Sequence, residues 1–216
     1  MHDFEGDLAV LVPDADMEAA VTGLLLSRPP ALGIRDVGFD VFLHRDHDNG
    51  CFMRGHDFLR PMVSVYAHGL ILFDRHGCGQ EKRPREELER IVAEQLSVSG
   101  WGDRAAAVVI DPELESWIWS DSPHVDSCLG WEGKKPNLRK WLEEGGWWPS
   151  AAPKPERPKE AFLSAIHRAQ RPPSSAIFEE LAIKISLKRC TDAAFLRFRE
   201  ILQKWFPAEP TRAPSG

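Results

Sequence analysis

The sequence predicts an α/β protein: a mainly parallel sheet flanked by helices, followed by a helical C-terminal part. Three observations lead to this prediction. Short apolar runs alternate with helix-like segments up to Asp121, as in chains that build a parallel sheet covered by helices. Two of these runs, GLILFD and AAAVVID, end abruptly in the acidic residues Asp74 and Asp111. Beyond Asp121 the strand signals stop and helical patterns take over.

The first two elements are expected to be a buried strand and a helix. Leu8–Val12 is a short apolar run closed by Pro13, which fits the strand. Asp14 or Asp16 can then cap a helix that runs to Leu26. Four apolar residues recur at helical spacing in that segment: Met17, Val21, Leu24 and Leu25.

The remaining strands follow at intervals. Val37–Leu43 predicts a second strand, and the polar stretch His44–His56 predicts a loop. Leu70–Phe73 predicts a third strand, and Ala105–Ile110 a fourth. Between them, a helix is expected to begin at Pro84, because the missing N–H of proline costs nothing in the first helical turn. Its apolar stripe comprises Leu88, Ile91, Val92 and Leu96.

The second half is expected to be rich in helices and tryptophan. Seven of the eight tryptophans lie between Trp101 and Trp148. A Pro- and Lys-rich connector, SAAPKPERPKE, separates one expected helix from three later ones. The four expected helices are 137–144, 160–169, 175–187 and 192–206. We therefore predict an α/β domain at 1–122, a Trp-rich helical region at 123–207 and a disordered tail at 208–216.

Composition and charge narrow the class of protein. The chain has 216 residues, 43% of them hydrophobic, which is enough for a substantial core. Neither a membrane span nor a secretory signal is recognisable, and four separated cysteines favour a reduced, cytoplasmic protein. The net charge is −6, yet residues 151–216 carry 12 Lys and Arg against 7 Asp and Glu. This basic end could hold a phosphate backbone or an acidic partner, or could simply be a solvated face.

The two strands that end in acidic residues predict one acidic site. The carboxyl ends of parallel strands meet at one edge of a sheet, where functional groups gather. Asp74 and Asp111 are therefore expected to lie near each other. Such a site most often holds Mg²⁺ or Mn²⁺ for chemistry on phosphates. The glycines Gly77 and Gly79 behind Asp74 allow a tight, open turn that a ligand could approach.

The turn Asp74-Arg75-His76 resembles the Asp-x-Asp of TOPRIM domains, the fold of topoisomerases, primases and many phage-defence nucleases. The resemblance covers roughly residues 5–121. It implies divalent-metal ligands at the Asp-x-Asp after the third strand and at a Glu after the first. In this chain Asp14 or Asp16 stands in place of the Glu, and His76 in place of the second Asp. Because Mn²⁺ tolerates imidazole better than Mg²⁺ does, the resemblance favours manganese.

A second resemblance concerns the segment after the fourth strand. PELESWIW looks like a segment of small TOPRIM-like proteins from bacterial defence loci, and RPKEAFL and SSAIFEELAIKISLKRC resemble a small component of a methylation-associated phage-defence system. This implies partners among other defence proteins. Glu113 or Glu115 could complete the metal site with Asp74 and Asp111, and His76 could be a ligand or a general acid–base group.

Each of these acidic residues also has a plainer interpretation. Acidic residues at strand ends often do no more than cap helices, and this applies to Asp14, Asp16, Asp111 and Glu113. In LHRDHDNGCFMRGHD the residues His44, His47, Cys51 and His56 have spacings that a zinc site could use, but they match no common zinc motif. Arg45 and Arg54 in this stretch could instead contact substrate phosphates, as could His44.

Two further features could bind partners. Trp147 and Trp148 lie in a Gly/Pro turn, where one could be exposed as an anchor or both could clamp the helical half onto the sheet. Lys184 and Lys188 are four residues apart and are expected to share a helix face that could hold a nucleic-acid backbone. A solvated helix surface is the alternative for these lysines.

Two hypotheses remain. In the first, the protein is a metal-dependent nuclease, or a nuclease subunit, of an anti-phage system, with catalytic residues Asp74, His76 and Glu115. In the second, it is a degenerate, non-catalytic TOPRIM-like subunit that binds partner proteins in a larger defence complex. A nucleotide-sensing module is a weaker third option. The sequence has no GxGxxG turn, P-loop, HExxH or GxSxG motif.

Overall fold

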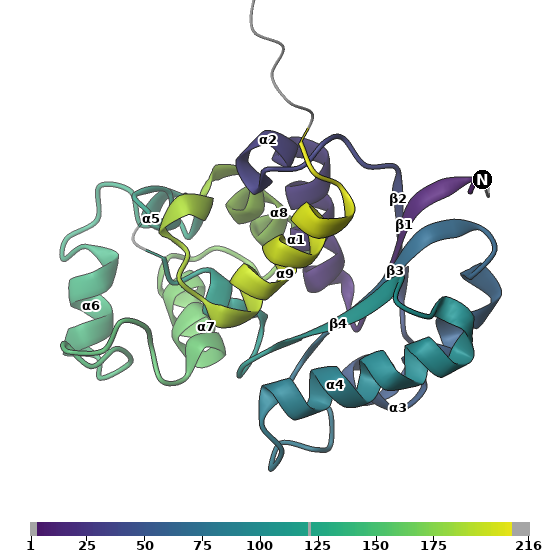
Figure 1. The fold of residues 1–216 in the computed structure, drawn as a ribbon. Helices are drawn as coiled ribbons and strands as arrows, with labels where there is room; N and C mark the ends of the chain where they lie inside the picture. The colour runs from purple at the N-terminus through teal and green to yellow at the C-terminus, as the bar shows by residue number, and fades with distance from the viewer. Residues whose placement is uncertain (1–3, 121, 209–216) are drawn as a thin grey trace, which may run out of the picture.

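The computed structural model describes residues 4–120 and 122–208, and within them four strands form one all-parallel sheet (Figure 1). The strands are β1 (Gly6–Val12), β2 (Phe39–Leu43), β3 (Tyr66–Asp74) and β4 (Ala105–Ile110), in the order β2-β1-β3-β4. The predicted α/β class, with a parallel sheet and a helical C-terminal part, is confirmed.

Both faces of the sheet are buried, which explains why the strands are apolar runs and not alternating patterns. Val10 pairs with Val41 on one side and Leu70 on the other, and Asp74 pairs with Ile110 at the end of β3. Successive side chains point to opposite faces. One hydrophobic cluster accordingly contains Leu8, Val10, Leu70 and Leu72, and the other contains Ala9, Leu11, Ile71 and Phe73.

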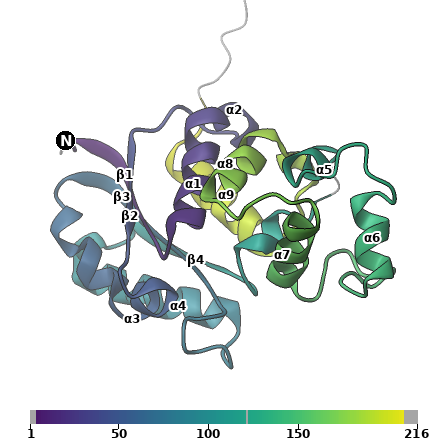
Figure 2. The ribbon, with the colours of Figure 1, turned by 180° about the vertical axis from the view of Figure 1, so that it is seen from behind.

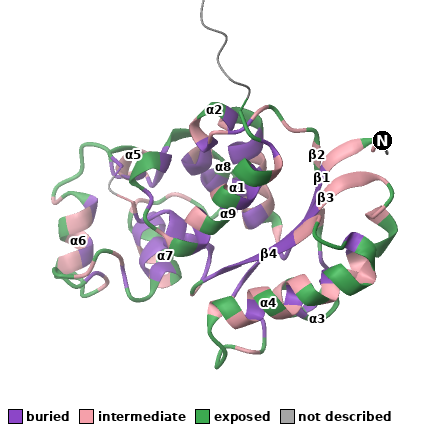
Figure 3. Ribbon diagram, viewed as in Figure 1, coloured by how far each residue is buried: buried purple, intermediate pink, exposed green. Residues whose placement is uncertain are grey.

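Helices cover the sheet on both sides (Figures 1 and 2). On one side lie α3 (His47–Leu59) and α4 (Arg85–Leu96), which are buried toward the strands and exposed outward (Figure 3). On the other side lie α1 (Ala15–Ser27), α8 (Ser175–Lys184) and α9 (Ala193–Trp205). The remaining elements are α2 (Pro29–Leu32), η1 (Arg60–Met62), η2 (Ser97–Trp101), η3 (Leu114–Trp117), α5 (His124–Cys128), α6 (Leu138–Glu144), α7 (Pro158–Arg168) and η4 (Leu187–Arg189).

The stretch His44–His56, which we expected to be a loop, is largely helical, and this prediction was wrong. Helix α3 contains Gly50 and Gly55, whose low helix propensity obscures the pattern. Gly55 has a packing reason: a Cβ there would lie 2.6 Å from Ile71 Cδ1 and 3.2 Å from a Leu11 methyl. The glycine therefore lets α3 approach the sheet closely.

The C-terminal helices share a core with the sheet. Helix α8 packs against α1, and one hydrophobic cluster contains Leu24 of α1, Phe178 of α8 and Trp148. Two boundaries differ from expectation. Helix α7 begins at Pro158, and α8 ends at Lys184 because Ile185 is extended. Of the tail expected to be disordered, residues 209–216 lie outside the described part of the chain.

Two general properties of the chain can be read from the fold. The four cysteines are free and buried. In residues 4–120 and 122–208, no helix is long and apolar enough to cross a membrane.

Asp192 joins the C-terminal helix to the segment after β4. Its Oδ1 caps α9 by accepting hydrogen bonds from the backbone amides of Ala194 and Phe195, at 3.0 and 3.2 Å. The same oxygen accepts a hydrogen bond from Trp117 Nε1 at 3.1 Å, and Oδ2 pairs with Lys154 Nζ at 2.7 Å. One half-buried carboxylate thus fixes α9, η3 and the connector before α7.

Replacing Asp192 with Ala should lower the free energy of unfolding by about 3 kcal/mol, because the helix loses its cap and the indole N–H and the ammonium lose their partner. Asp192→Asn keeps an oxygen for the cap and should cost about 1 kcal/mol. Urea unfolding of both variants measures the difference. Equal losses would show that the cap contributes nothing.

Candidate functional site

Carboxylates from segments that follow all four strands gather at the carboxyl edge of the sheet. Asp74 ends β3, Asp14 follows β1, Asp48 lies in α3 after β2, and Glu115 lies in η3 after β4. The charges of Asp48, Glu115 and Asp14 each act on the carboxyl of Asp74. The strand order therefore brings one acidic side chain from each connection toward Asp74, as the parallel topology predicts.

Asp74 is the centre of this acidic cluster, which comprises Asp14, Asp48, Asp74 and Glu115. The residue is only 8% exposed, and its Oδ1 has no hydrogen-bond partner among the described residues. The backbone amide of Leu114 donates to the carboxylate. Burial raises the pKa of Asp74 well above its usual range, and the charges of Asp48 and Glu115 raise it further. A buried carboxyl that lacks a counter-charge favours either a proton or a cation.

The two aspartates beside it are partly engaged by backbone amides. Asp48 Oδ1 accepts a hydrogen bond from the Asp74 amide at 2.8 Å, and burial raises the pKa of Asp48. Asp14 Oδ1 caps α1 by accepting from the amides of Asp16 and Met17, each at 3.0 Å. Burial, with the charge of Asp14, raises the pKa of Asp16. Asp14 is thus the helix cap that one of the two interpretations predicted.

Glu115 is buried beside the one lysine that reaches the cluster within the described residues. It is 4% exposed, and burial raises its pKa to about 7, against the opposing charge of Lys159. Lys159 Nζ lies 3.7 Å from Glu115 Oε1. Burial acts to lower the pKa of Lys159, yet the charges of Glu115, Asp74, Glu113 and Asp14 together raise it. This lysine comes from α7, in the C-terminal half.

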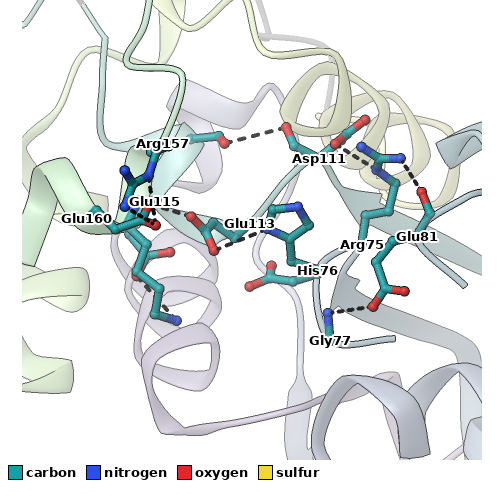
Figure 4. A network of polar contacts seen from close by, with 12 residues as sticks. Arg75, His76, Gly77, Glu81, Asp111, Glu113, Glu115, Arg157 and Glu160 are labelled. Carbon is teal, nitrogen blue, oxygen red and sulfur yellow. Dashed lines mark hydrogen bonds and ion pairs between the residues drawn. The ribbon is translucent and has the colours of Figure 1, made fainter. Parts of the chain in front are cut away.

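Glu113 contacts both the start of α7 and His76 (Figure 4). Its Oε1 accepts a hydrogen bond from the Lys159 amide at 3.0 Å, and its Oε2 lies 3.8 Å from His76 Nδ1. The figure shows Glu113 between His76 and the segment that carries Arg157 and Glu160. Glu113 thus accepts an amide in the first turn of α7, a contact that the sequence did not predict, and its side chain does not cap η3, the helix that follows it.

Asp111 is engaged by an arginine. Its Oδ1 accepts from Arg75 Nε at 2.8 Å, and Arg75 also donates to the Glu81 carbonyl at 2.7 Å (Figure 4). The Asp111 side chain is 41% exposed. The structure therefore brings Asp74, Asp14 and Glu115 toward one another, with Asp16 at the edge, whereas Asp111 and Glu113 are held in other contacts.

A divalent ion would find few protein ligands here. Among the described residues, no three His, Cys, Asp or Glu side chains lie close enough together to hold a metal ion. The unpartnered, buried Oδ1 of Asp74 nevertheless fits an ion that takes most of its ligands from elsewhere. Mg²⁺ behaves in this way: it is commonly bound by one or two carboxylates, substrate phosphates and several waters.

The histidine-rich stretch is committed to local contacts. His44 Nδ1 accepts from the Asp46 amide at 3.1 Å, and His47 Nδ1 lies 3.1 Å from the Pro13 carbonyl. Cys51 is fully buried, and burial raises its pKa. His56 Nε2 lies 3.5 Å from an Asp57 carboxylate oxygen. These four side chains therefore contact different groups.

The other candidate binding residues lie at separate places. Arg45 and Arg54 are exposed beside Asp46, in a pocket after β2. Trp148 is buried against Trp119, whereas Trp147 is half-buried. Lys184 pairs with Glu180 at 2.8 Å. Since α8 ends at Lys184, Lys188 lies in η4, and the expectation that the two lysines share a helix face was wrong.

The sequence alone did not identify Asp48 or Lys159 as members of the cluster. Asp48 stood in a stretch expected to be a loop, and Lys159 lies far along the chain in the basic half. The one sequence signal for Asp48 was its position five residues after the predicted second strand, and no such signal pointed to Lys159.

Comparison with known proteins does not identify a family for this chain. No family model matches it, and neither a similar curated protein nor a similar solved structure is found. The resemblance to TOPRIM domains therefore rests on strand order and acidic positions alone.

The pKa of Glu115 makes stability depend on pH. In the unfolded chain the carboxyl has its ordinary pKa of 4.5, but in the folded protein its pKa is about 7. As pH rises from 4.5 to 7, the unfolded state releases this proton first, so the free energy of unfolding falls. Glu115→Gln does not titrate. Its stability relative to the parent should therefore rise by about 2 kcal/mol between pH 5 and pH 8, measured by urea unfolding. A pH-independent difference would contradict the assignment.

Proposed function

We propose that this protein is a metal-dependent nuclease, or the nuclease subunit of a larger assembly, that hydrolyses phosphodiester bonds at the acidic cluster. One observation carries the proposal: Asp74 is buried at the end of a central strand, with a carboxylate oxygen that lacks a partner and three other carboxylates around it. A fold gains no stability from this arrangement, since like charges are brought together out of water. Such sites are typically functional.

The residues of the site divide into two roles. Asp74 supplies the unpartnered carboxylate oxygen that would hold Mg²⁺ or Mn²⁺, with substrate phosphate and water as the remaining ligands, and Asp14 and Asp48 add negative charge nearby. When bound, the ion lowers the pKa of a water molecule and neutralises developing phosphate charge. Glu115, with a pKa of about 7, is suited to accept or return a proton near neutral pH. His76 is exposed and lies 3.8 Å from Glu113, and its imidazole would supply a proton to a leaving oxygen.

The biological setting is part of the same proposal. The resemblance of PELESWIW, RPKEAFL and SSAIFEELAIKISLKRC to defence-locus proteins supports a role in a bacterial anti-phage system, alongside other defence proteins. The free, buried cysteines are compatible with the cytoplasm. In that setting the nuclease would act on invading DNA or its transcripts.

A second candidate function has its own support. Asp111 and Glu113 are engaged by Arg75 and the α7 backbone, and the described residues offer no three-ligand metal group. A TOPRIM-like fold that has lost its metal would keep such contacts and serve as a binding or scaffold subunit. The basic C-terminal half would then contact partner proteins or nucleic acid.

Asp74→Asn separates the two functions. The variant removes the charge that the cluster repels, so it should unfold at a higher temperature than the parent. If Asp74 holds the ion, the same variant should lose Mn²⁺ binding in isothermal titration. It should also lose at least about 100-fold of its cleavage of plasmid or single-stranded nucleic acid, in line with the loss of a charged catalytic ligand.

Glu94→Gln is a matched control, because Glu94 is an exposed carboxylate on α4 that pairs only with Arg90 on the surface. It should leave both metal binding and cleavage unchanged. A more stable Asp74→Asn variant that cleaves as well as the parent would rule out the nuclease. A parent protein that binds no Mn²⁺ and cleaves nothing would favour the scaffold function.

A further inference from the structure

Beside the acidic cluster lies a group of exposed basic side chains that the proposed chemistry does not fully use. Three side chains belong to it: Lys159, Arg157 and His76, whose side chains are 51%, 65% and 58% exposed. Glu113 links His76 to the start of α7, and Glu160 lies near both His76 and Arg157 (Figure 4). We name these three residues the cationic rim.

The position of Lys159 is fixed at two points. Its backbone amide donates to Glu113 at 3.0 Å, and its ammonium lies 3.7 Å from Glu115. Both glutamates belong to the segment that follows β4. Since Glu113 already satisfies an amide at the start of α7, an anion near this helix would be bound by side chains. Half of the Lys159 side chain remains open to solvent for such a contact.

An aromatic surface adjoins the rim. The Arg157 guanidinium lies 5.7 Å from the centre of the Trp147 ring. A pocket of about 230 Å³ is lined by Trp147, Arg157, Gly145, Gly146, Pro149 and one carboxylate, that of Glu156. A side-chain carbon at Gly146, where φ is 73°, would meet no atom within 4 Å, so this side of the turn is open space. A half-buried indole beside an exposed arginine is a suitable surface for a flat base.

We infer that the substrate of this site is a single-stranded nucleic acid, with a phosphate bound by Lys159 and Arg157 and a neighbouring base stacked on Trp147. This inference rests on the proposed function, whose acidic cluster supplies the place of cleavage. Stacking requires a base that is not paired within a duplex, whereas the phosphate contacts would suit either form. The aromatic surface is therefore the feature that selects single strands.

The acidic cluster imposes a condition on this binding. Without a divalent ion, the charges of Asp74 and its neighbours oppose a phosphate placed beside Lys159. With an ion present, the repulsion falls and the cationic rim can engage the backbone. Binding of a single strand should therefore increase in a divalent cation.

The test uses the full chain and a fluorescein-labelled single-stranded DNA 20-mer, with fluorescence anisotropy measured in Ca²⁺ and in EDTA. In Ca²⁺, Lys159→Met and Trp147→Leu should each weaken binding about fivefold or more. Lys159→Met should also reduce the slope of log affinity against log salt by about 0.7, as expected for one lost contact with a single strand. Lys159→Arg keeps the charge and should restore most of the affinity.

Lys140→Met is the matched control. Lys140 is an exposed lysine of α6 that lies 3.8 Å from Glu144, and its loss changes the net charge equally. It should bind within about twofold of the parent, since it removes no backbone contact. Thermal unfolding of each variant identifies any that does not fold, and Lys159→Gln, which also removes the charge, then serves in place of Lys159→Met.

The outcomes distinguish this inference from the proposed function. If Lys159→Met and Trp147→Leu bind like the parent, or if a duplex of the same length binds as tightly as the single strand, the inference is overturned. A parent that binds no oligonucleotide overturns it too, even where Mn²⁺ binding by Asp74 persists. If Asp74→Asn cleaves like the parent while the rim variants lose affinity, the nuclease site fails but single-strand binding stands.

Discussion

Asp74 lies at the end of β3, where its carboxylate is almost completely shielded from water. A negative charge at such a position is stable only when a cation lies close to it. Much of the surrounding structure is arranged around that requirement. Asp48 accepts a hydrogen bond from the backbone amide of Asp74, and the Leu114 amide donates one to the Asp74 carboxylate. Lys159, from the C-terminal half of the chain, places its ammonium beside Glu115. The ammonium supplies one positive charge against several carboxylates, so the cluster remains short of positive charge.

The parallel sheet could be predicted from the sequence because both of its faces are buried. Runs such as AVLV and LILF report burial on two sides, and the abrupt change to Asp74 marks the end of a strand. The capping role of Asp14 was one of two stated alternatives. These features are local, since each depends on neighbours within a few residues along the chain.

The rest depended on contacts between distant segments. Helix α3 was hidden because Gly50 and Gly55 are poor helix formers, and the reason for Gly55 is its approach to Ile71 in another element. The partner of Glu115 is Lys159, which no spacing rule connects to it. Asp111 directly follows β4, much as Asp74 ends β3, yet its carboxylate accepts a hydrogen bond from Arg75 and does not join the acidic cluster. The pattern of apolar residues along the chain indicates which residues lie at an edge of the sheet, but not which side chains from distant segments pair with them there.

The distribution of tryptophan has a practical consequence for optical work on this protein. Trp101 is the one indole in the cluster between the sheet and α3 and α4, whereas Trp117, Trp119, Trp131 and Trp148 are buried in the cluster on the opposite side of the sheet. Tryptophan fluorescence therefore reports mainly on the side of the sheet that is covered by α1, α8 and α9, whereas far-UV circular dichroism reports on the helices of both sides. A fluorescence transition at a lower denaturant concentration than the circular dichroism transition would show that the side with α1, α8 and α9 unfolds before the side with α3 and α4.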